Sequence, residues 1–220
     1  MPVTLRKAAP DDPQSHDNGH LESRGVKDSY FIEQCEGKPA PTPLLAIQGF
    51  ANTLDVEEDS DELESVESFQ RFLEQSEMVE PGFEVEPQHL APARELRDAV
   101  REALTANSEG RPDPKAMAHM IAGARTLAID LQPDEQGHLA LDLSPADTFP
   151  HLGSQLLAIA FQSQIEGTWE RLKLCENPEC RWAFYDNSRN RSGSWCRMGL
   201  CGNRLKNRAY RERRKQAARG

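Results

Sequence analysis

Four of the five cysteines form two pairs with equal internal spacing, Cys175-x4-Cys180 and Cys196-x4-Cys201, with fifteen residues between the pairs. Two kinds of chemistry fit this pattern, a shared metal ion and a pair of disulfide bonds. Four thiolates satisfy the tetrahedral coordination of Zn2+, and a gap of four residues lets both sulfurs of a pair reach one ion. The spacing therefore predicts a four-cysteine Zn2+ site. We expect it to be structural, because four thiolates leave no open position for water or substrate.

The cellular compartment decides between metal and disulfides. The first 25 residues lack the apolar core of a signal peptide, and no apolar run approaches the roughly 20 residues that span a bilayer. We therefore expect a cytoplasmic protein with no membrane segment, in which disulfides are rare and clustered cysteines bind metal. Disulfides and buried free thiols remain the alternatives. The fifth cysteine, Cys35, is expected to be an ordinary free thiol.

Charge is distributed unevenly along the 220 residues. Residues 171–220 hold 14 Lys and Arg against 4 Asp and Glu, a net charge of +10, whereas the whole chain carries −10, so the first 170 residues carry −20. An acidic body with a basic end is typical of a protein that binds a polyanion, although a merely solubilising helix is the alternative. The nucleic-acid contacts predicted on a helix after the last cysteine are Arg204, Lys206, Asn207, Arg208, Arg211, Arg213, Arg214 and Lys215.

The residues around the cysteine pairs predict the shape of the metal module. Residues 181–195 have the pattern of a strand, a Gly/Ser/Asn turn and a short return strand, which with a knuckle and a helix start makes a treble-clef-like arrangement. Gly202 is expected to tolerate a tight backbone, and Asn203 to cap a helix that begins at Arg204. Four aromatic side chains are candidates either for the core of this module or for stacking on single-stranded bases: Trp182, Tyr185, Trp195 and Tyr210.

Upstream, residues 1–42 predict a disordered tail, because they are rich in Pro, Asp, Ser and Gly. Residues 43–170 predict a mostly helical body with an acidic loop over 56–65. We expect this loop to be exposed, and folding of the loop back onto the basic tail is the alternative. The predicted helices cover 65–79, 92–110, 113–127 and 146–167, and the predicted hairpin strands cover 126–132 and 138–144. The fold class is therefore α+β: a mostly helical body with a small antiparallel hairpin, followed over residues 171–220 by a treble-clef-like zinc finger that ends in a basic helix.

With these residues assembled, the chain resembles the CGNR zinc finger family, whose name is the tetrapeptide Cys201–Arg204. The upstream region is similar to that family's ABATE domain, which usually opens with a sequence like LALDFVNT. Here LLAIQGFANTLD stands at 44–55, in which Asn52, Thr53 and Asp55 match, whereas Gln48 and Gly49 depart from the usual Leu and Asp. The resemblance implies a stress-induced bacterial transcription regulator whose finger binds DNA and whose upstream domain senses a ligand or a partner.

These observations favour a bacterial transcription regulator that binds DNA through a four-cysteine zinc finger and the basic helix beside it. The helical body would form a homodimer or sense a small-molecule or protein signal. Asn52 and Thr53 are candidates for lining a ligand pocket. For both residues, helix packing or capping is the alternative. An RNA-binding or ribosome-associated factor and a zinc-dependent protein-interaction module are the alternative functions. An enzyme is not expected, because no nucleophile-elbow, phosphate-loop or paired metal-carboxylate motif is present.

Overall fold

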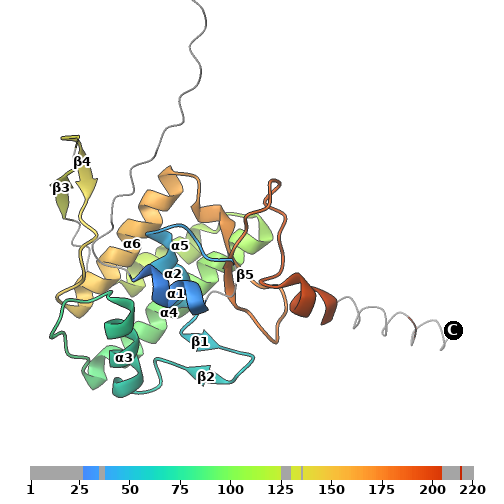
Figure 1. The fold of residues 1–220 in the computed structure, drawn as a ribbon, viewed down its shortest axis with the longest axis horizontal. Helices are drawn as coiled ribbons and strands as arrows, with labels where there is room; N and C mark the ends of the chain where they lie inside the picture. Colours follow the sequence, from blue (N-terminus) through green and yellow to red (C-terminus); the bar gives the residue numbers. More distant parts are fainter. Residues whose placement is uncertain (1–26, 35–37, 125–129, 135, 205–213, 215–220) are drawn as a thin grey trace, which may run out of the picture.

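The computed structural model describes residues 27–34, 38–124, 130–134, 136–204 and 214 (Figure 1). The helices are α1 (Asp28–Gln34), α2 (Leu44–Ala51), α3 (Val66–Ser76), α4 (Pro87–Glu109), α5 (Pro114–Gly123) and α6 (Phe149–Ile165), with a 3-10 turn η1 (Trp169–Arg171) and a π-helical turn η2 (Met198–Gly202). The strands are β1 (Leu54–Asp55), β2 (Ser60–Asp61), β3 (Leu131–Pro133), β4 (Leu139–Leu141), β5 (Leu172–Leu174) and β6 (Ala183–Tyr185). No helix in these ranges combines the length and the apolar character needed to cross a bilayer.

Helix α4 is the central element of the helical body. It packs against α5, α2 and α3 and also against strand β5, which leads into the cysteine segment. The apolar repeat of Leu96, Val100 and Leu104 predicts its buried face, and all three side chains are buried in the main core. The helix ends where Gly110 adopts a left-handed conformation with φ +65°, as the sequence predicts for a glycine at this point.

The remaining helix boundaries follow from capping residues. Ser65 and Ser68 cap the start of α3 reciprocally, and the Asp113 side chain accepts a hydrogen bond from the Lys115 N–H at the start of α5. Thr148 accepts in the same way at the start of α6, from the backbone N–H three residues later. The four predicted body helices are therefore confirmed, with boundaries that shift by a few residues.

Helix α1 lies in a segment for which the sequence predicts disorder. Phe31 is fully buried, and its ring meets that of Phe72 edge-on with centroids 6.1 Å apart. The ring fills the space beside Gly49 on α2, where an added Cβ would overlap it. The prediction of disorder is thus wrong for residues 27–34, because one aromatic side chain completes the core beside a residue that has none. Residues 1–26 lie outside the described part of the chain.

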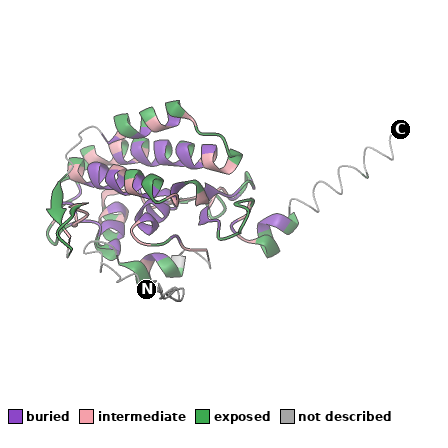
Figure 2. Cartoon of the chain, turned by 90° about the horizontal axis from the view of Figure 1, so that it is seen from above, coloured by how far each residue is buried: buried purple, intermediate pink, exposed green. Residues whose placement is uncertain are grey.

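Three two-stranded antiparallel hairpins complete the described fold: β1–β2, β3–β4 and β5–β6. Hairpin β3–β4 confirms the predicted hairpin, but its strands are shorter than expected, and residues 125–129 are not described. The Leu131 and Leu139 side chains remain 59% and 80% exposed, because this hairpin extends from the body at the end opposite the cysteine segment (Figures 1 and 2). Alternating apolar residues therefore form strands here without gaining a buried face.

The packing of Phe31 makes a stability prediction. Phe31→Ala should lower the free energy of unfolding by about 3–5 kcal/mol, because it removes a buried ring and leaves a cavity beside Gly49. Phe161→Ala is the matched control, since that ring is 55% exposed on α6 and should cost far less. Urea unfolding of the two variants measures the difference, and equal losses would show that α1 is not part of the folded body.

Candidate metal centre

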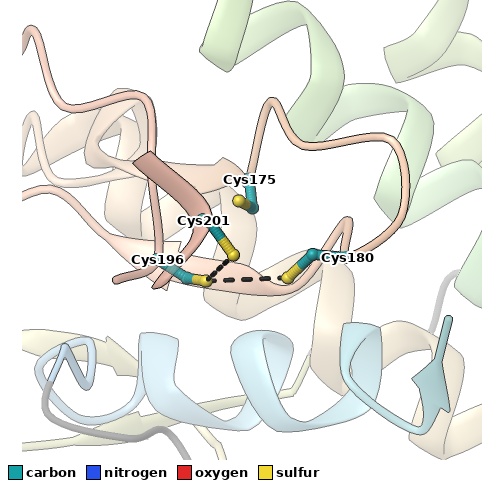
Figure 3. Close-up of side chains that lie close together, drawn as sticks. All are labelled: Cys175, Cys180, Cys196 and Cys201. Carbon is teal, nitrogen blue, oxygen red and sulfur yellow. Dashed lines mark hydrogen bonds between the residues drawn. The ribbon is translucent and has the colours of Figure 1, made fainter. Parts of the chain in front are cut away.

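The four paired cysteines converge on one point between the body and the last described turn (Figure 3). All four are buried, and their sulfur atoms lie within 4.8 Å of one another. The Cys196 sulfur is 3.6 Å from that of Cys180 and 3.7 Å from that of Cys201. A tetrahedral zinc ion with Zn–S bonds of about 2.3 Å separates its ligands by about 3.8 Å, so the cluster has the dimensions of a zinc site with four thiolate ligands.

The close packing of the four thiols shifts their pKa values in opposite directions. Hydrogen bonds from the Cys180 thiol, and then from the Cys196 thiol, lower the pKa of Cys175 to about 2. The contact with Cys175 raises the pKa of Cys180 to about 12, and contacts with Cys175 and Cys180 raise that of Cys196 well above its ordinary value. One thiolate is therefore favoured and further ones are opposed by its charge. A divalent cation offsets the repulsion between thiolates. With Zn2+ bound, all four cysteines would therefore be deprotonated.

The first cysteine pair lies on the knuckle between β5 and β6. The Cys175 N–H donates to the Trp182 carbonyl at 2.9 Å, and the Cys180 N–H donates to the Asn177 carbonyl at 3.0 Å. Arg181 follows in a left-handed conformation with φ 56°, which turns the chain back into β6. The predicted knuckle is present. However, the partner of β6 is β5, before the first cysteine, and the described residues between β6 and the second cysteine pair form no return strand, so that part of the prediction is wrong.

A buried ion pair holds the loop that leads from β6 to the second cysteine pair. Lys173 Nζ lies 2.8 Å from Asp186 Oδ2, and both side chains are almost fully buried. Burial would raise the pKa of Asp186, but hydrogen bonds from Lys173, Ser188 and the Gly193 N–H outweigh it and hold that pKa well below its usual range. A Cβ at Gly193 would lie 2.6 Å from Asp186 Oδ1, so only glycine allows the loop to close on the carboxylate.

The second cysteine pair opens a helical turn earlier than the sequence predicts. Turn η2 begins at Met198, with Arg197 as its N-cap, and the helix continues through Asn203. The Asn203 amide donates to the Gly199 carbonyl at 3.0 Å from inside the helix, so its predicted role as N-cap is wrong. Gly202 does not have a left-handed φ; a Cβ there would lie 3.1 Å from the indole Cδ1 of Trp195, so the glycine serves close packing rather than an unusual backbone.

Polar side chains of the body seat the metal module on helix α2. Asn52 pairs with the backbone of Ala183 as a neighbouring strand would, accepting from its N–H at 2.7 Å and donating to its carbonyl at 3.1 Å. Gln48 donates to the same carbonyl and accepts from the Ala40 N–H at 2.7 Å. Residues 38–42, predicted to be disordered, are thereby tied to the core, because a buried amide requires hydrogen-bond partners.

Arg101 on α4 contacts both the end of α2 and the metal knuckle. Its guanidinium donates to the Ala51 carbonyl at 2.7 Å, at the C-terminus of α2, and to the Arg181 carbonyl at 3.0 Å. Burial, followed by the charges of Arg97 and Arg181, lowers the pKa of Arg101 to about 10. Arg101 therefore remains a cation at neutral pH and links the end of a body helix to the metal knuckle.

Sequence reasoning missed these polar contacts, although some of them leave a signal. Gln48 interrupts the otherwise apolar run LLAIQGFA, and Lys173 stands between two leucines in a strand. A polar residue inside a buried element needs a partner, so both positions indicate a specific contact. The identity of the partners, Ala183 and Asp186, is not visible in the local sequence, because they lie 135 and 13 residues away.

Asn52 and Thr53, the predicted pocket residues, border a cleft of about 490 Å³ between β1–β2 and the metal module. The polar atoms of both side chains make contacts within the chain: those of Asn52 bind Ala183, and the Thr53 hydroxyl donates to the Phe50 carbonyl at 2.8 Å. These contacts match the packing and capping alternative. A ligand in the cleft stays a prediction.

The predicted nucleic-acid contacts are described only at two positions. Arg204 continues the helix from η2 and is exposed, and Arg214 is exposed as well. The other six lie outside the described residues, as does most of the predicted basic helix: Lys206, Asn207, Arg208, Arg211, Arg213 and Lys215.

The aromatic residues of the module pack inward. Trp182 and Trp195 are partly buried against the four cysteines, and Tyr185 lies in the main core. Of the two alternatives given for these side chains, packing in a core therefore matches the structure. Tyr210 lies outside the described residues.

Comparison with known families assigns the body. A family model described as "ABATE: Putative stress-induced transcription regulator" matches residues 46–162, more than half of the 220-residue chain. The chain belongs to the ABATE family. A second model, the CGNR zinc finger, matches residues 171–214 and contains all four clustered cysteines. A comparison with curated proteins finds no match.

The ABATE assignment confirms the resemblance inferred from the sequence and gives its motifs a structural meaning. Asn52, in the family's opening motif, binds Ala183 of the CGNR finger, so the motif joins the two matched regions. Gly49, which departs from the usual aspartate, accommodates the Phe31 ring in this ABATE protein. The four cysteines of its zinc finger form the Zn2+ site, and the zinc would fold a segment too small to hold a core of its own.

The metal site predicts the zinc content of the protein. Purified wild-type protein should contain about one zinc ion per chain, because four thiolates complete a single tetrahedral site. Cys196→Ser should lose the metal, and Cys35→Ser is the matched control, because Cys35 lies outside the two Cys-x4-Cys pairs of the sequence. Elemental analysis with a thiol titration checks this; five reactive thiols and no metal in native wild-type protein would contradict it.

The pairing of Asn52 with Ala183 makes a second prediction. Asn52→Asp keeps the shape but replaces the amide donor with an oxygen facing the Ala183 carbonyl, so stability should fall by about 2 kcal/mol or more. Asn187→Asp makes the same chemical change at an exposed position of the finger and should be near neutral. Urea unfolding and hydrogen exchange at the Ala183 amide measure the effect. Equal stabilities would mean that Asn52 does not hold the finger.

Proposed function

We propose that this ABATE protein is a bacterial transcription regulator that binds DNA through its zinc finger and the basic segment that follows it. The observation that carries the proposal is a rigid metal centre at the start of that segment. Cys201 is a zinc ligand, and Arg204, three residues later, continues the same helix and is exposed. Arginine suits phosphate, because its planar guanidinium donates two parallel hydrogen bonds.

The charge distribution supports a polyanionic partner. Residues 171–220 carry a net charge of +10, and one of the few acidic groups in this region, Asp186, is buried against Lys173. A net positive charge of this size favours binding to a polyanion such as DNA. Because Trp182, Trp195 and Tyr185 pack inward, base stacking receives less support than contact with a duplex backbone.

The role of the metal in this proposal is architectural. Four thiolates occupy every position of a tetrahedral ion, so the site positions the basic segment and takes no part in a reaction. The ABATE domain supplies the regulatory input, and its rigid attachment through Asn52 and Arg101 would pass a change in the body to the finger.

A salt titration of DNA binding tests the proposal. If six phosphates are engaged, log K should fall with log salt at a slope near −5, about −0.9 for each contact. The double variant Arg208→Ala/Arg211→Ala should bind every sequence more weakly and reduce the slope by about 2, since each arginine represents one phosphate contact.

Arg111→Ala/Arg71→Ala is the matched control, because both arginines are exposed on the helical body. This control should leave the slope unchanged. Absence of duplex binding at low salt would overturn the proposal. A preference for single-stranded RNA would select the RNA-binding alternative, and binding to a protein that survives nuclease treatment would select the interaction module.

A further inference from the structure

The acidic hairpin, defined here as residues 54–62 with strands β1 and β2, faces the zinc finger across the cleft described above. Glu57 and Glu58 line the cleft from the hairpin, and Arg197 and Leu200 line it from the finger. Six of the eight residues over 55–62 are acidic, so the hairpin presents a dense negative charge on this side of the cleft.

One ion pair joins the hairpin to the start of the basic segment. Arg204 Nη1 lies 2.5 Å from Glu57 Oε1, although the two residues are 147 positions apart in the sequence. The hydrogen bond to Glu57, followed by its charge, raises the pKa of Arg204. The tip of the acidic hairpin therefore already forms an ion pair with the first cationic side chain of the proposed DNA-binding segment.

The hairpin is built to hold its carboxylates in this position. At its base, Arg97 of α4 is buried and lies 2.5 Å from Asp61 Oδ1. At its tip, the Asp55 carboxylate accepts from the N–H groups of Glu57 and Glu58 at 2.9 and 3.1 Å, which fixes the turn. The sequence predicts an exposed loop over 56–65. Residues 56–60 are exposed as predicted, but Leu63 is buried, and the contacts above fix the shape of the loop.

We infer that the acidic hairpin is an autoinhibitory arm that competes with nucleic acid for the basic segment. This inference rests on the proposed DNA binding. A carboxylate and a phosphate are both acceptors for guanidinium N–H groups, so Glu57 and a DNA phosphate compete for Arg204. The carboxylates of Glu58 and Asp59, which are exposed at the tip, add a negative potential that repels DNA from the same side.

The contact is suited to reversal. The side chains of Arg204 and Glu57 are 50% and 39% exposed, so the pair is screened by salt, over a Debye length of about 8 Å at physiological ionic strength. A polymer with many regularly spaced phosphates can outcompete a single such pair, whereas an isolated anion cannot. The hairpin thus raises the Kd for DNA without preventing binding.

Removing the hairpin's charges tests the inference. Glu57→Gln/Glu58→Gln should lower the Kd for a duplex of about 20 base pairs by roughly two- to tenfold at low salt, with the gain shrinking as salt rises. Glu80→Gln/Glu84→Gln removes the same charge from exposed positions between α3 and α4 and is the matched control. Zinc content and urea unfolding of all three proteins establish that the substitutions leave the fold intact.

The outcomes separate the two ideas. A larger gain in duplex affinity for the Glu57/Glu58 variant than for the Glu80/Glu84 variant supports the autoinhibitory arm. Equal affinities in the two variants, with wild-type binding intact, overturn the arm but leave the proposed function standing. If none of the three proteins binds duplex DNA, the proposed function fails and the arm fails with it.

Discussion

Four buried sulfur atoms within 4.8 Å of one another cannot all carry negative charge unless a cation lies among them. This constraint organises the C-terminal part of the protein. It requires the knuckle between β5 and β6 and the turn η2 to meet, although the cysteines they carry are separated by a loop of fifteen residues. Zinc fits the distances and the ligand type, and it supplies the free energy that a segment of this size lacks on its own.

The zinc finger packs on the ABATE body in a fixed orientation and is not an independent domain on a linker. Asn52 and Gln48 bind the backbone of β6, and Asn107 and Ser108 of α4 bind the backbone of β5. These contacts are directional hydrogen bonds in buried surroundings, so they specify one orientation and are costly to leave unmade. A rigid seat of this kind lets the body determine where the basic segment points.

Electrostatics divides the molecule into an acidic body and a basic finger, and the acidic hairpin brings the two signs together. The pairs differ in strength according to their exposure. Lys173 and Asp186 are buried and hold a loop in place, whereas Glu57 and Arg204 are exposed to solvent and form a contact that salt and competing anions can displace. The first kind of pair sets the architecture, and the second is suited to regulation.

The metal site, the body helices and the family could all be predicted from the sequence, because they depend on short-range spacing. Ligand pairs, apolar periodicity and caps such as Asp113 act within a few residues. Other features arise only when distant parts of the chain pack together. Phe31 orders its helix because Gly49, on another helix, leaves room for the ring. Glu57 meets Arg204 because the fold brings together residues 147 positions apart. Such pairings depend on which surfaces meet after folding, and no local pattern encodes that.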